Sequence, residues 1–371
     1  MAGIATPAQG LPSMETASTP AASAELALKG LPPAAIALLL RAFGGPGPVL
    51  AASRAQLAAV VATGAVERIQ APVDPESLAQ TLAWLALPGH ELIAWDDPDY
   101  PRALLELGHA PPVLYFTGQR GVLNRPALAI VGSRNATPQG EENAAAFAEA
   151  LSHSGFTIVS GLALGIDAAA HVGALRGAGA TLAVVGTGLD RVYPARNRTL
   201  AHAIAAAGGL LSEFSPGTPP LRFNFPRRNR LIAGLARGVL VVEAALSSGS
   251  LITARLAGES GREVFAIPGS IHSPLARGCH RLIRDGAKLV ETAQDILDEL
   301  GATTRSPPPR AAMIPAHPLL KALGEDPAAV DVLCTRTGQT AAAVLEALVL
   351  LELEGHVMAL PGGRWQRQHS P

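Results

Sequence analysis

The strongest constraint on the fold is a pattern repeated in the middle of the chain: an apolar run, a turn of small residues, then a helix-like stretch. The runs 127–131, 156–159 and 238–242 are each followed by a turn that contains glycine or serine, and then by such a stretch. Small residues at a strand-to-helix turn expose backbone N–H groups beside the helix N-terminus, a geometry that receives phosphate or another anion. Three such turns on one sheet predict an anion-binding face.

The candidate strands are continuous Val, Ile, Leu and Ala runs rather than alternating ones, which is typical of strands buried on both faces. Helix-like stretches separate them, so the pattern predicts an α/β fold with a Rossmann-like, doubly wound, mostly parallel sheet. Ligands of such sheets bind beyond the carboxyl ends of the strands, where the turns lie. The candidate strands are 127–131, 156–159, 181–185, 209–212, 238–242, 263–267 and 288–290.

Composition shifts divide the chain into five expected parts. Residues 1–25 are expected to be a disordered tail, or in part sequence upstream of a start at Met14, and residues 303–318 a proline-rich linker. Short helices broken by Gly and Pro over 26–95 indicate a SAM-like or helix-hairpin-helix-like module, for which a structural or protein-contact role is favoured over DNA contact. The Rossmann-like domain is expected over 110–302. Two helices and a hairpin over 319–368 indicate a winged-helix-like domain that binds either DNA or protein.

The formal net charge of −1 gives the whole chain no polyanion-binding character. A local basic patch is nevertheless present, because no acid occurs between Glu213 and Glu243. A neutral chain with such a patch is compatible with nucleic-acid binding. The arginines of this stretch are Arg222, Arg227, Arg228, Arg230 and Arg237.

The two cysteines, Cys279 and Cys334, are far apart, and neither has a second cysteine at metal-ligand spacing. We therefore expect no disulfide framework, no zinc site and no cofactor, as in a protein of the reducing cytoplasm. The start of the chain lacks the features of a signal peptide, and no apolar run approaches the length of a membrane span. A membrane partner is not expected.

The segment 223–230, Phe-Asn-Phe-Pro-Arg-Arg-Asn-Arg, is the sharpest local pattern. It interleaves two aromatic residues with arginines in a chain that has few aromatic residues. Bases stack on aromatic rings while arginines follow the phosphates, so the segment favours nucleic-acid contact. The alternative keeps both phenylalanines in the core and makes Asn229 and one arginine structural partners.

The remaining motifs leave alternatives open. Gly132-Ser133-Arg134 is not part of a G-x-G-x-x-G sequence, and no P-loop occurs, which disfavours dinucleotides and P-loop nucleotide hydrolysis. Asp167 and His171 share a helix face as a conceivable acid–base pair, but no nucleophile is evident near them. Glu243 is favoured as a structural acid over a general base. Ser248-Gly249-Ser250 contains either helix caps or an anion contact.

Together these motifs resemble the DNA-processing protein A (DprA, also called Smf) family over nearly the whole chain. The resemblance implies a domain that binds single-stranded DNA, forms a homodimer, protects incoming DNA in natural transformation and loads the RecA recombinase onto it. An asparagine is common in the family at the position of His280, a departure that affects one hydrogen bond. The implied DNA and phosphate contacts are Gly132, Ser133, Arg134, Ser160, Gly161, Arg222, Phe225, Arg228, Asn229, Arg230, Ser248, Gly249 and Ser250.

A non-catalytic DNA-binding protein is the favoured function, with no catalytic residue assigned. The alternative is a nucleotide-phosphate-binding enzyme of the phosphoribohydrolase-like Rossmann type. Such enzymes carry a Pro-Gly-Gly-x-Gly-Thr motif, which Pro268-Gly269-Ser270 does not supply. A third alternative is a scaffold protein that acts through its terminal modules.

Overall fold

Parallel strands form where the continuous apolar runs predict them. The computed structural model describes residues 19–107, 110–301, 317–324 and 326–368. Contacts divide the chain into a first unit, residues 1–125 and 182–235, and a second unit, residues 126–181 and 236–371. Each unit contains strands and helices, so the α/β class is confirmed.

The second unit holds five parallel strands in the order β4-β3-β7-β8-β9. Helices α8, α9 and α14 supply one buried cluster with this sheet, whereas α12 contacts β7 and β8 without contributing to that cluster. Helices therefore cover both faces, as a doubly wound sheet requires. The elements are β3 (Ala127–Val131), α8 (Pro138–His153), β4 (Thr157–Ser160), α9 (Ile166–Arg176), β7 (Gly238–Val241), α12 (Ser250–Glu259), β8 (Glu263–Ala266), α13 (Arg277–Arg284), β9 (Lys288–Leu289) and α14 (Ala293–Glu299).

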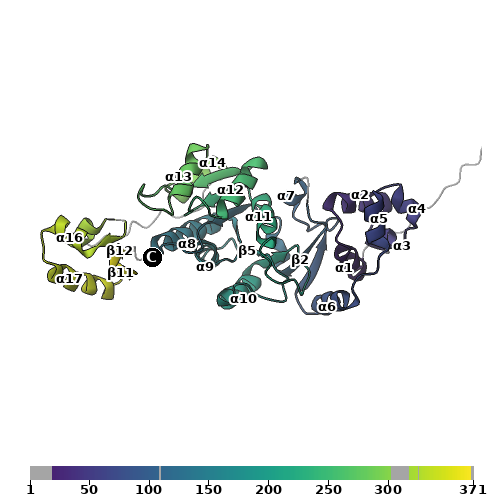
Figure 1. The fold of residues 1–371 in the computed structure, drawn as a ribbon, viewed down its shortest axis with the longest axis horizontal. Coiled ribbons are helices and arrows are strands. Elements are labelled where there is room, and N and C mark those ends of the chain that lie inside the picture. The colour runs from purple at the N-terminus through teal and green to yellow at the C-terminus, as the bar shows by residue number, and fades with distance from the viewer. Residues whose placement is uncertain (1–18, 108–109, 302–316, 325, 369–371) are drawn as a thin grey trace, which may run out of the picture. The chain divides into compact units, whose positions relative to one another are not determined.

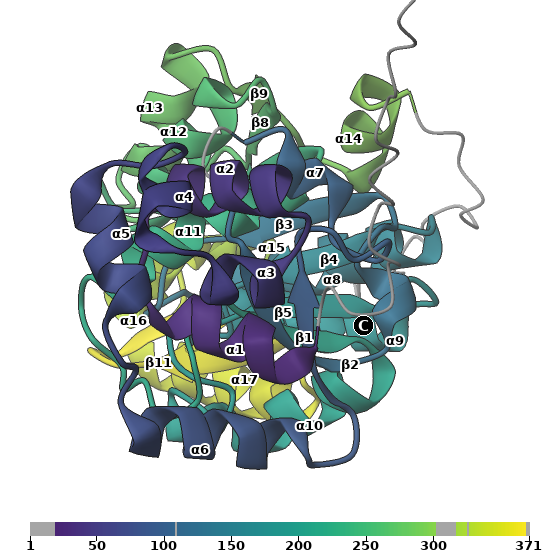
Figure 2. The same ribbon diagram turned by 90° about the vertical axis from the view of Figure 1, so that its right-hand side faces the viewer.

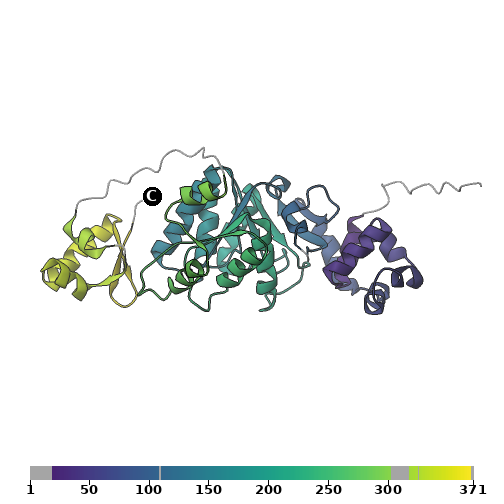
Figure 3. The same ribbon diagram turned by 90° about the horizontal axis from the view of Figure 1, so that it is seen from above.

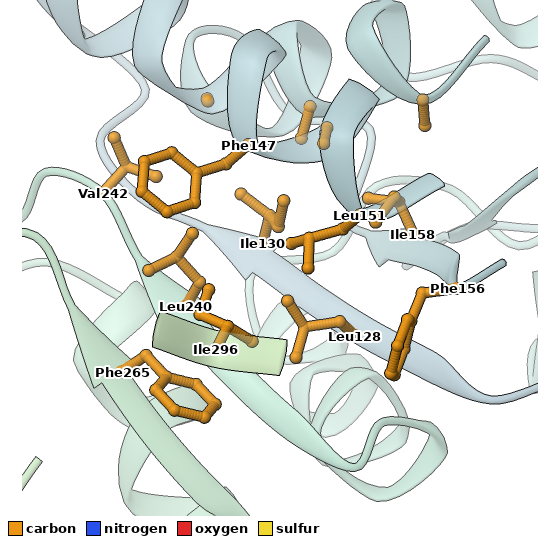
Figure 4. Close-up of a cluster of buried hydrophobic side chains, with 14 of the residues drawn as sticks. Leu128, Ile130, Phe147, Leu151, Phe156, Ile158, Leu240, Val242, Phe265 and Ile296 are labelled. Atoms are coloured by element: carbon orange, nitrogen blue, oxygen red, sulfur yellow. The ribbon is translucent and has the colours of Figure 1, made fainter. Parts of the chain in front are cut away.

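Figure 4 shows the hydrophobic core of this unit, in which Leu128 and Ile130 of β3 face Phe147 and Leu151 of α8. Leu240 of β7 and its neighbours on β4, β8 and α14 continue the same layer. Burial of so many large apolar side chains is the main driving force that holds the helices on the sheet. It fixes the strand ends from which the glycine-rich turns emerge.

The first unit contains β1 (His90–Ala94), β2 (Val113–Gly118), β6 (Gly209–Ser212) and β5 (Thr181–Val184), in the order β1-β2-β6-β5. β1 and β6 are both antiparallel to β2, while β5 and β6 are parallel. The expectation of helices up to residue 95 missed β1, whose short and half-buried sequence carries no continuous apolar run. The helices and short 3-10 turns of this part are α7 (Arg102–Leu105), η2 (Arg120–Val122), η3 (Ala195–Asn197), α10 (Arg198–Ala207) and α11 (Asn224–Leu235).

Among the described residues, six helices precede β1 (Figure 2). Five of them, α1 to α5, share one hydrophobic core. Leu26 of α1, Leu39 of α2 and Leu57 of α4 are among its buried members. α1 begins at Pro20, so the end of the expected tail is helical, and the rest of that tail lies outside the described residues. The helices are α1 (Pro20–Leu28), α2 (Pro33–Phe43), α3 (Pro46–Ala51), α4 (Arg54–Ala58), α5 (Thr63–Gln70) and α6 (Pro75–Leu85).

The C-terminal module, coloured yellow in Figure 1 and Figure 3, is the winged helix that the sequence predicts. Its three-stranded sheet has the order β10-β12-β11, and its core includes Leu333, Leu348 and Trp365. The expected linker falls on residues outside the described ones, apart from its last two. The elements are α15 (Pro318–Leu323), β10 (Ala328–Ala329), α16 (Val330–Thr337), α17 (Ala341–Leu353), β11 (Val357–Leu360) and β12 (Arg364–Arg367). In the part of the chain that the structure describes, no helix has the length and apolar character needed to cross a membrane.

Candidate nucleic-acid interface

The turn after β3 presents Arg134 on a rigid backbone. A Cβ added to Gly132 would lie 2.6 Å from the Ile166 side chain and 2.9 Å from the Glu243 carbonyl oxygen, so a larger residue does not fit without a shift. The Ile166 N–H donates to the carbonyl oxygen of the mostly buried Ser133 at 3.1 Å. The Arg134 side chain, in contrast, is exposed. The turn therefore offers one outward guanidinium at the carboxyl edge of the sheet.

Glu243 has the structural role that the sequence favours. Its carboxylate accepts hydrogen bonds from the Thr137 backbone N–H at 2.9 Å and from the Thr137 hydroxyl at 2.6 Å. Thr137 is in turn the N-cap of α8. Burial raises the pKa of Glu243 above its ordinary value of 4.5, although the two bonds from Thr137 oppose that shift. The acid thereby ties the end of β7 to the start of α8.

We expect the contribution of Glu243 to the free energy of unfolding to fall as pH rises from 4.5 toward neutrality. A carboxyl whose pKa is raised by folding binds its proton more tightly in the folded state, and that advantage is lost when it ionises. The measurement is the difference in unfolding free energy between wild type and Glu243→Gln across this pH range. A difference that grows in favour of wild type with rising pH would contradict the assignment.

The turn after β4 does not expose Ser160 or Gly161, which the sequence analysis assigned to anion binding. The Ser160 hydroxyl donates to the Ile130 carbonyl oxygen at 2.6 Å, and the side chain is fully buried. The carboxylate of Asp167 accepts the N–H groups of Gly161 and Ala163 at 3.1 and 3.4 Å. An internal carboxylate thus occupies the position expected for a phosphate, and Ser160 and Gly161 are structural.

The turn after β7 opens at the same edge as the turn after β3, because these two strands are parallel neighbours. The hydroxyls of Ser248 and Ser250 lie 2.7 Å apart, and the Ser250 N–H also donates to the Ser248 hydroxyl. Gly249 between them is exposed, and no atom outside its immediate neighbours lies within 4 Å of an added Cβ. α12 begins at Ser250, so this exposed backbone lies at the start of a helix.

In the first unit, the start of α11 is anchored on the turn after β5. The side-chain amide of Asn224 donates to the Gly186 carbonyl oxygen at 3.1 Å. A Cβ added to Gly186 would lie 3.1 Å from the ring of Phe225, so the absence of a side chain lets this ring approach the turn. The ring of Phe225 also contacts Tyr193, with 5.7 Å between the ring centroids.

Arg228 and Arg230 point inward, which corrects their assignment to the DNA surface. Arg228 is 4% exposed and donates to the Val184 carbonyl oxygen and to the Asn229 side chain. Arg230 forms an ion pair with Glu213, in which both side chains are largely buried. Asn229 is thus a partner of Arg228. Arg228 and Arg230 thus hold α11 against β5 and Glu213. This part of the segment 223–230 has the structural role that the sequence analysis gave as the alternative to DNA contact.

The outward arginines of this segment are Arg222 and Arg227. The Arg227 side chain is 58% exposed, reaches Glu213 only at 3.5 Å and lies over the ring of Phe214. Phe223 is 64% exposed. The sequence analysis favoured nucleic-acid contact for the segment as a whole, but neither Arg227 nor Phe223 was among the individual contacts that the resemblance implied. Helical spacing could have indicated the inward direction of Arg228, because this residue shares a helix face with the buried Leu231 and Ile232.

The conceivable acid–base pair is not assembled as one. His171 is fully buried, with Nδ1 at 2.7 Å from the Thr181 hydroxyl, while Asp167 caps the turn after β4. His280, the departure from the expected asparagine, places Nε2 at 2.9 Å from the Gly269 carbonyl oxygen and so contacts the turn after β8. Among the described residues, no group of three or more His, Cys, Asp or Glu side chains could hold a metal ion.

Comparison with known protein families gives two matches. Residues 91–301 match the family model described as DNA recombination-mediator protein A. Residues 303–363 match the model described as DprA winged helix domain. The first match includes all the turns and the arginine segment described above.

Individual proteins agree with these matches. The chain is 44% identical over 300 residues to Protein Smf of Escherichia coli (strain K12), which covers 78% of this chain and 80% of that protein. The solved structure of DNA processing protein A from Streptococcus pneumoniae is 41% identical, with a TM-score of 0.67, and covers 76% of this chain and 98% of that one. A structure of DNA processing protein A from Helicobacter pylori, described for its single-stranded DNA binding mode, is 31% identical, with a TM-score of 0.52, and covers 57% and 95%.

Proposed function

The chain belongs to the DNA recombination-mediator protein A family, and from this premise we propose that it binds single-stranded DNA through exposed arginines and turn amides. The family is one of DNA-processing proteins. The observation that carries the proposal is Arg134, an exposed guanidinium held on a turn that Gly132 and Ile166 fix in place. Guanidinium groups bind phosphates in a bidentate manner, and a rigid support lowers the entropy lost on binding.

Four further residues support contact with a single strand. Gly249 exposes backbone at the start of α12, while Arg222 and Arg227 are exposed at the start of α11. The exposed ring of Phe223 lies beside these arginines in sequence and offers a surface for an unpaired base. The single-stranded DNA binding mode described for the Helicobacter pylori relative supports the same choice of ligand. The proposed contacts are Gly132, Ser133, Arg134, Arg222, Phe223, Arg227, Ser248 and Gly249. The proposal leaves out Phe225 and Ser250, which the resemblance also implied, because the Phe225 ring packs on Gly186 and Tyr193 and Ser250 is buried.

The proposal extends to the role that the resemblance implies. The chain would protect incoming DNA during natural transformation, act as a homodimer and load the RecA recombinase onto the bound strand, all in the cytoplasm. A dimer would double the number of DNA contacts and raise affinity through avidity. Sedimentation velocity tests the dimer. The rate of RecA ATP hydrolysis on single-stranded DNA coated with single-strand-binding protein tests loading, and loading predicts a shorter lag when this chain is present.

We further propose that the chain acts by binding and not by catalysis. Two acids beside the turns, Asp167 and Glu243, each accept hydrogen bonds from backbone N–H groups. A general base needs a free lone pair directed at its substrate. Release of a free base from a nucleoside monophosphate would contradict this statement and favour the phosphoribohydrolase-like alternative.

Fluorescence anisotropy of a labelled oligodeoxythymidine and of a duplex of equal length tests the DNA proposal. We expect tighter binding to the single strand and a linear fall of log K with log salt concentration. Each neutralised phosphate of a single strand contributes about −0.7 to that slope, so three arginine contacts predict a slope near −2 or steeper. Equal affinity for duplex, or affinity that does not change with salt, would contradict the proposal.

A further inference from the structure

An aromatic side chain outside the proposed contacts is exposed in the loop after β5. Tyr193 is 46% exposed. Among the described residues, the large hydrophobic side chains that are exposed include only two aromatic ones, Tyr193 and Phe223. Single exposed hydrophobic side chains are common on protein surfaces, so the support of the Tyr193 ring and the charges near it decide its role.

The ring of Tyr193 rests on a fixed support. Its centroid lies 5.7 Å from that of Phe225, with 44° between the ring planes. The Phe225 ring lies against the Gly186 backbone on a helix that Asn224 anchors to the same glycine. The Arg228 guanidinium lies 6.0 Å from the centroid of the Phe225 ring. Contact with this ring restricts Tyr193 while almost half of its surface faces solvent.

The loop that carries Tyr193 is also basic. Arg191, Arg196 and Arg198 are exposed, and Asp190 is the one acid between residues 186 and 198. The carboxylate of Asp190 is engaged twice, by Arg191 at 2.7 Å and by the Gly217 N–H at 2.8 Å. The residues that flank Tyr193 in sequence therefore carry a net positive charge, three arginines against one acid. An exposed aromatic ring among arginines is the chemistry that recognises a base and its phosphates.

We infer that Tyr193 is a base-stacking residue that extends the single-stranded DNA site along the loop after β5. The inference rests on the proposed function and adds a specific contact to it. Its ligand is an unpaired nucleobase, because a base within a duplex has both faces covered by its stacked neighbours. Any base would serve, since every base has a π face.

Three variants test the inference against two oligonucleotides. Tyr193→Ala removes the ring and Tyr193→Phe keeps it. Leu105→Ala removes an equally exposed apolar side chain from α7, outside the proposed contacts, as a control. Each is titrated with oligodeoxythymidine and with an abasic oligonucleotide of equal length. We expect Tyr193→Ala to lose about 5- to 150-fold in affinity for oligodeoxythymidine, the range for one stacked base. Its affinity for the abasic strand, and both affinities of the other two variants, should match wild type.

The outcomes separate the inference from the proposed function. If wild type fails to bind oligodeoxythymidine, the proposed function fails. If wild type binds and Tyr193→Ala binds equally well, or loses the same affinity for both strands, stacking by Tyr193 is overturned. If Tyr193→Ala does not fold, photocrosslinking of wild type to a strand containing 5-iododeoxyuridine tests whether Tyr193 contacts a base. An adduct on Tyr193 supports the inference, and crosslinked complex without an adduct there overturns it.

Discussion

Arg134→Ala is expected to weaken binding of single-stranded DNA by about 10- to 100-fold at low salt. A hydrogen bond to a charged group contributes about 1.5–3 kcal/mol, and about 1.4 kcal/mol corresponds to a tenfold change in affinity. The Arg134 side chain is exposed and lies outside the hydrophobic core, so the unfolding temperature should stay unchanged. Anisotropy titration and thermal unfolding measure the two quantities. The slope of log K against log salt should also become shallower by about 0.7.

Arg237→Ala is the matched control for this variant. Arg237 is also exposed, but it precedes β7, and its N–H donates to the carbonyl oxygen of Ala127 at the start of β3. It therefore lies at the amino edge of the sheet, opposite the edge that carries Arg134. Its removal should leave DNA affinity near that of wild type. Equal losses from the two variants would mean that overall charge, and not the turn after β3, governs binding.

Arg228→Ala is expected to lower the free energy of unfolding by about 2–3 kcal/mol. The substitution leaves the buried Val184 carbonyl oxygen without its guanidinium donor, and an unsatisfied buried group costs about 1–3 kcal/mol. Truncation also removes the buried stem of the side chain, which adds to the loss. Urea unfolding followed by circular dichroism measures the change.

Arg227→Ala, one residue earlier, is the control because its side chain is mostly exposed. It should change stability by less than about 0.5 kcal/mol, as surface substitutions usually do, while weakening DNA binding. Were Arg228→Ala as stable as wild type, the inward position of this guanidinium would be wrong. A loss of DNA binding by Arg228→Ala would then report direct contact and not a disturbed helix.

The fold class could be predicted from the sequence because both sides of the parallel strands are buried. The runs that became β3, β4 and β7 are buried and mostly apolar, and such runs can be recognised in the sequence alone. β1 was not predicted, because a half-buried strand has no continuous apolar run to mark it in the sequence. It pairs antiparallel with β2 at the end of the sheet of the first unit. Its stability comes from a partner strand that lies twenty residues further along the chain.

The candidate site could be predicted by region but not by side chain. The pattern of Gly132-Ser133-Arg134 indicated both the turn and its exposed arginine. The Gly161 N–H donates to the Asp167 carboxylate. This bond depends on the backbone path of the turn, which cannot be deduced from the residue types alone. The inward direction of Arg228 could have been predicted from helical spacing, because Arg228 shares a helix face with Leu231 and Ile232. The contact between Tyr193 and Phe225 joins segments thirty residues apart and needed the structure.

Hydrogen exchange with and without oligodeoxythymidine tests the central claim most directly, because it reports on the backbone N–H groups of the turns. We predict slower exchange in the complex for peptides covering residues 132–135, 221–227 and 247–250. Peptides at the amino edge of the sheet, around Arg237, should exchange equally fast in both states. Slower exchange confined to the N-terminal helices or to the winged helix, with none at the turns, would contradict the account.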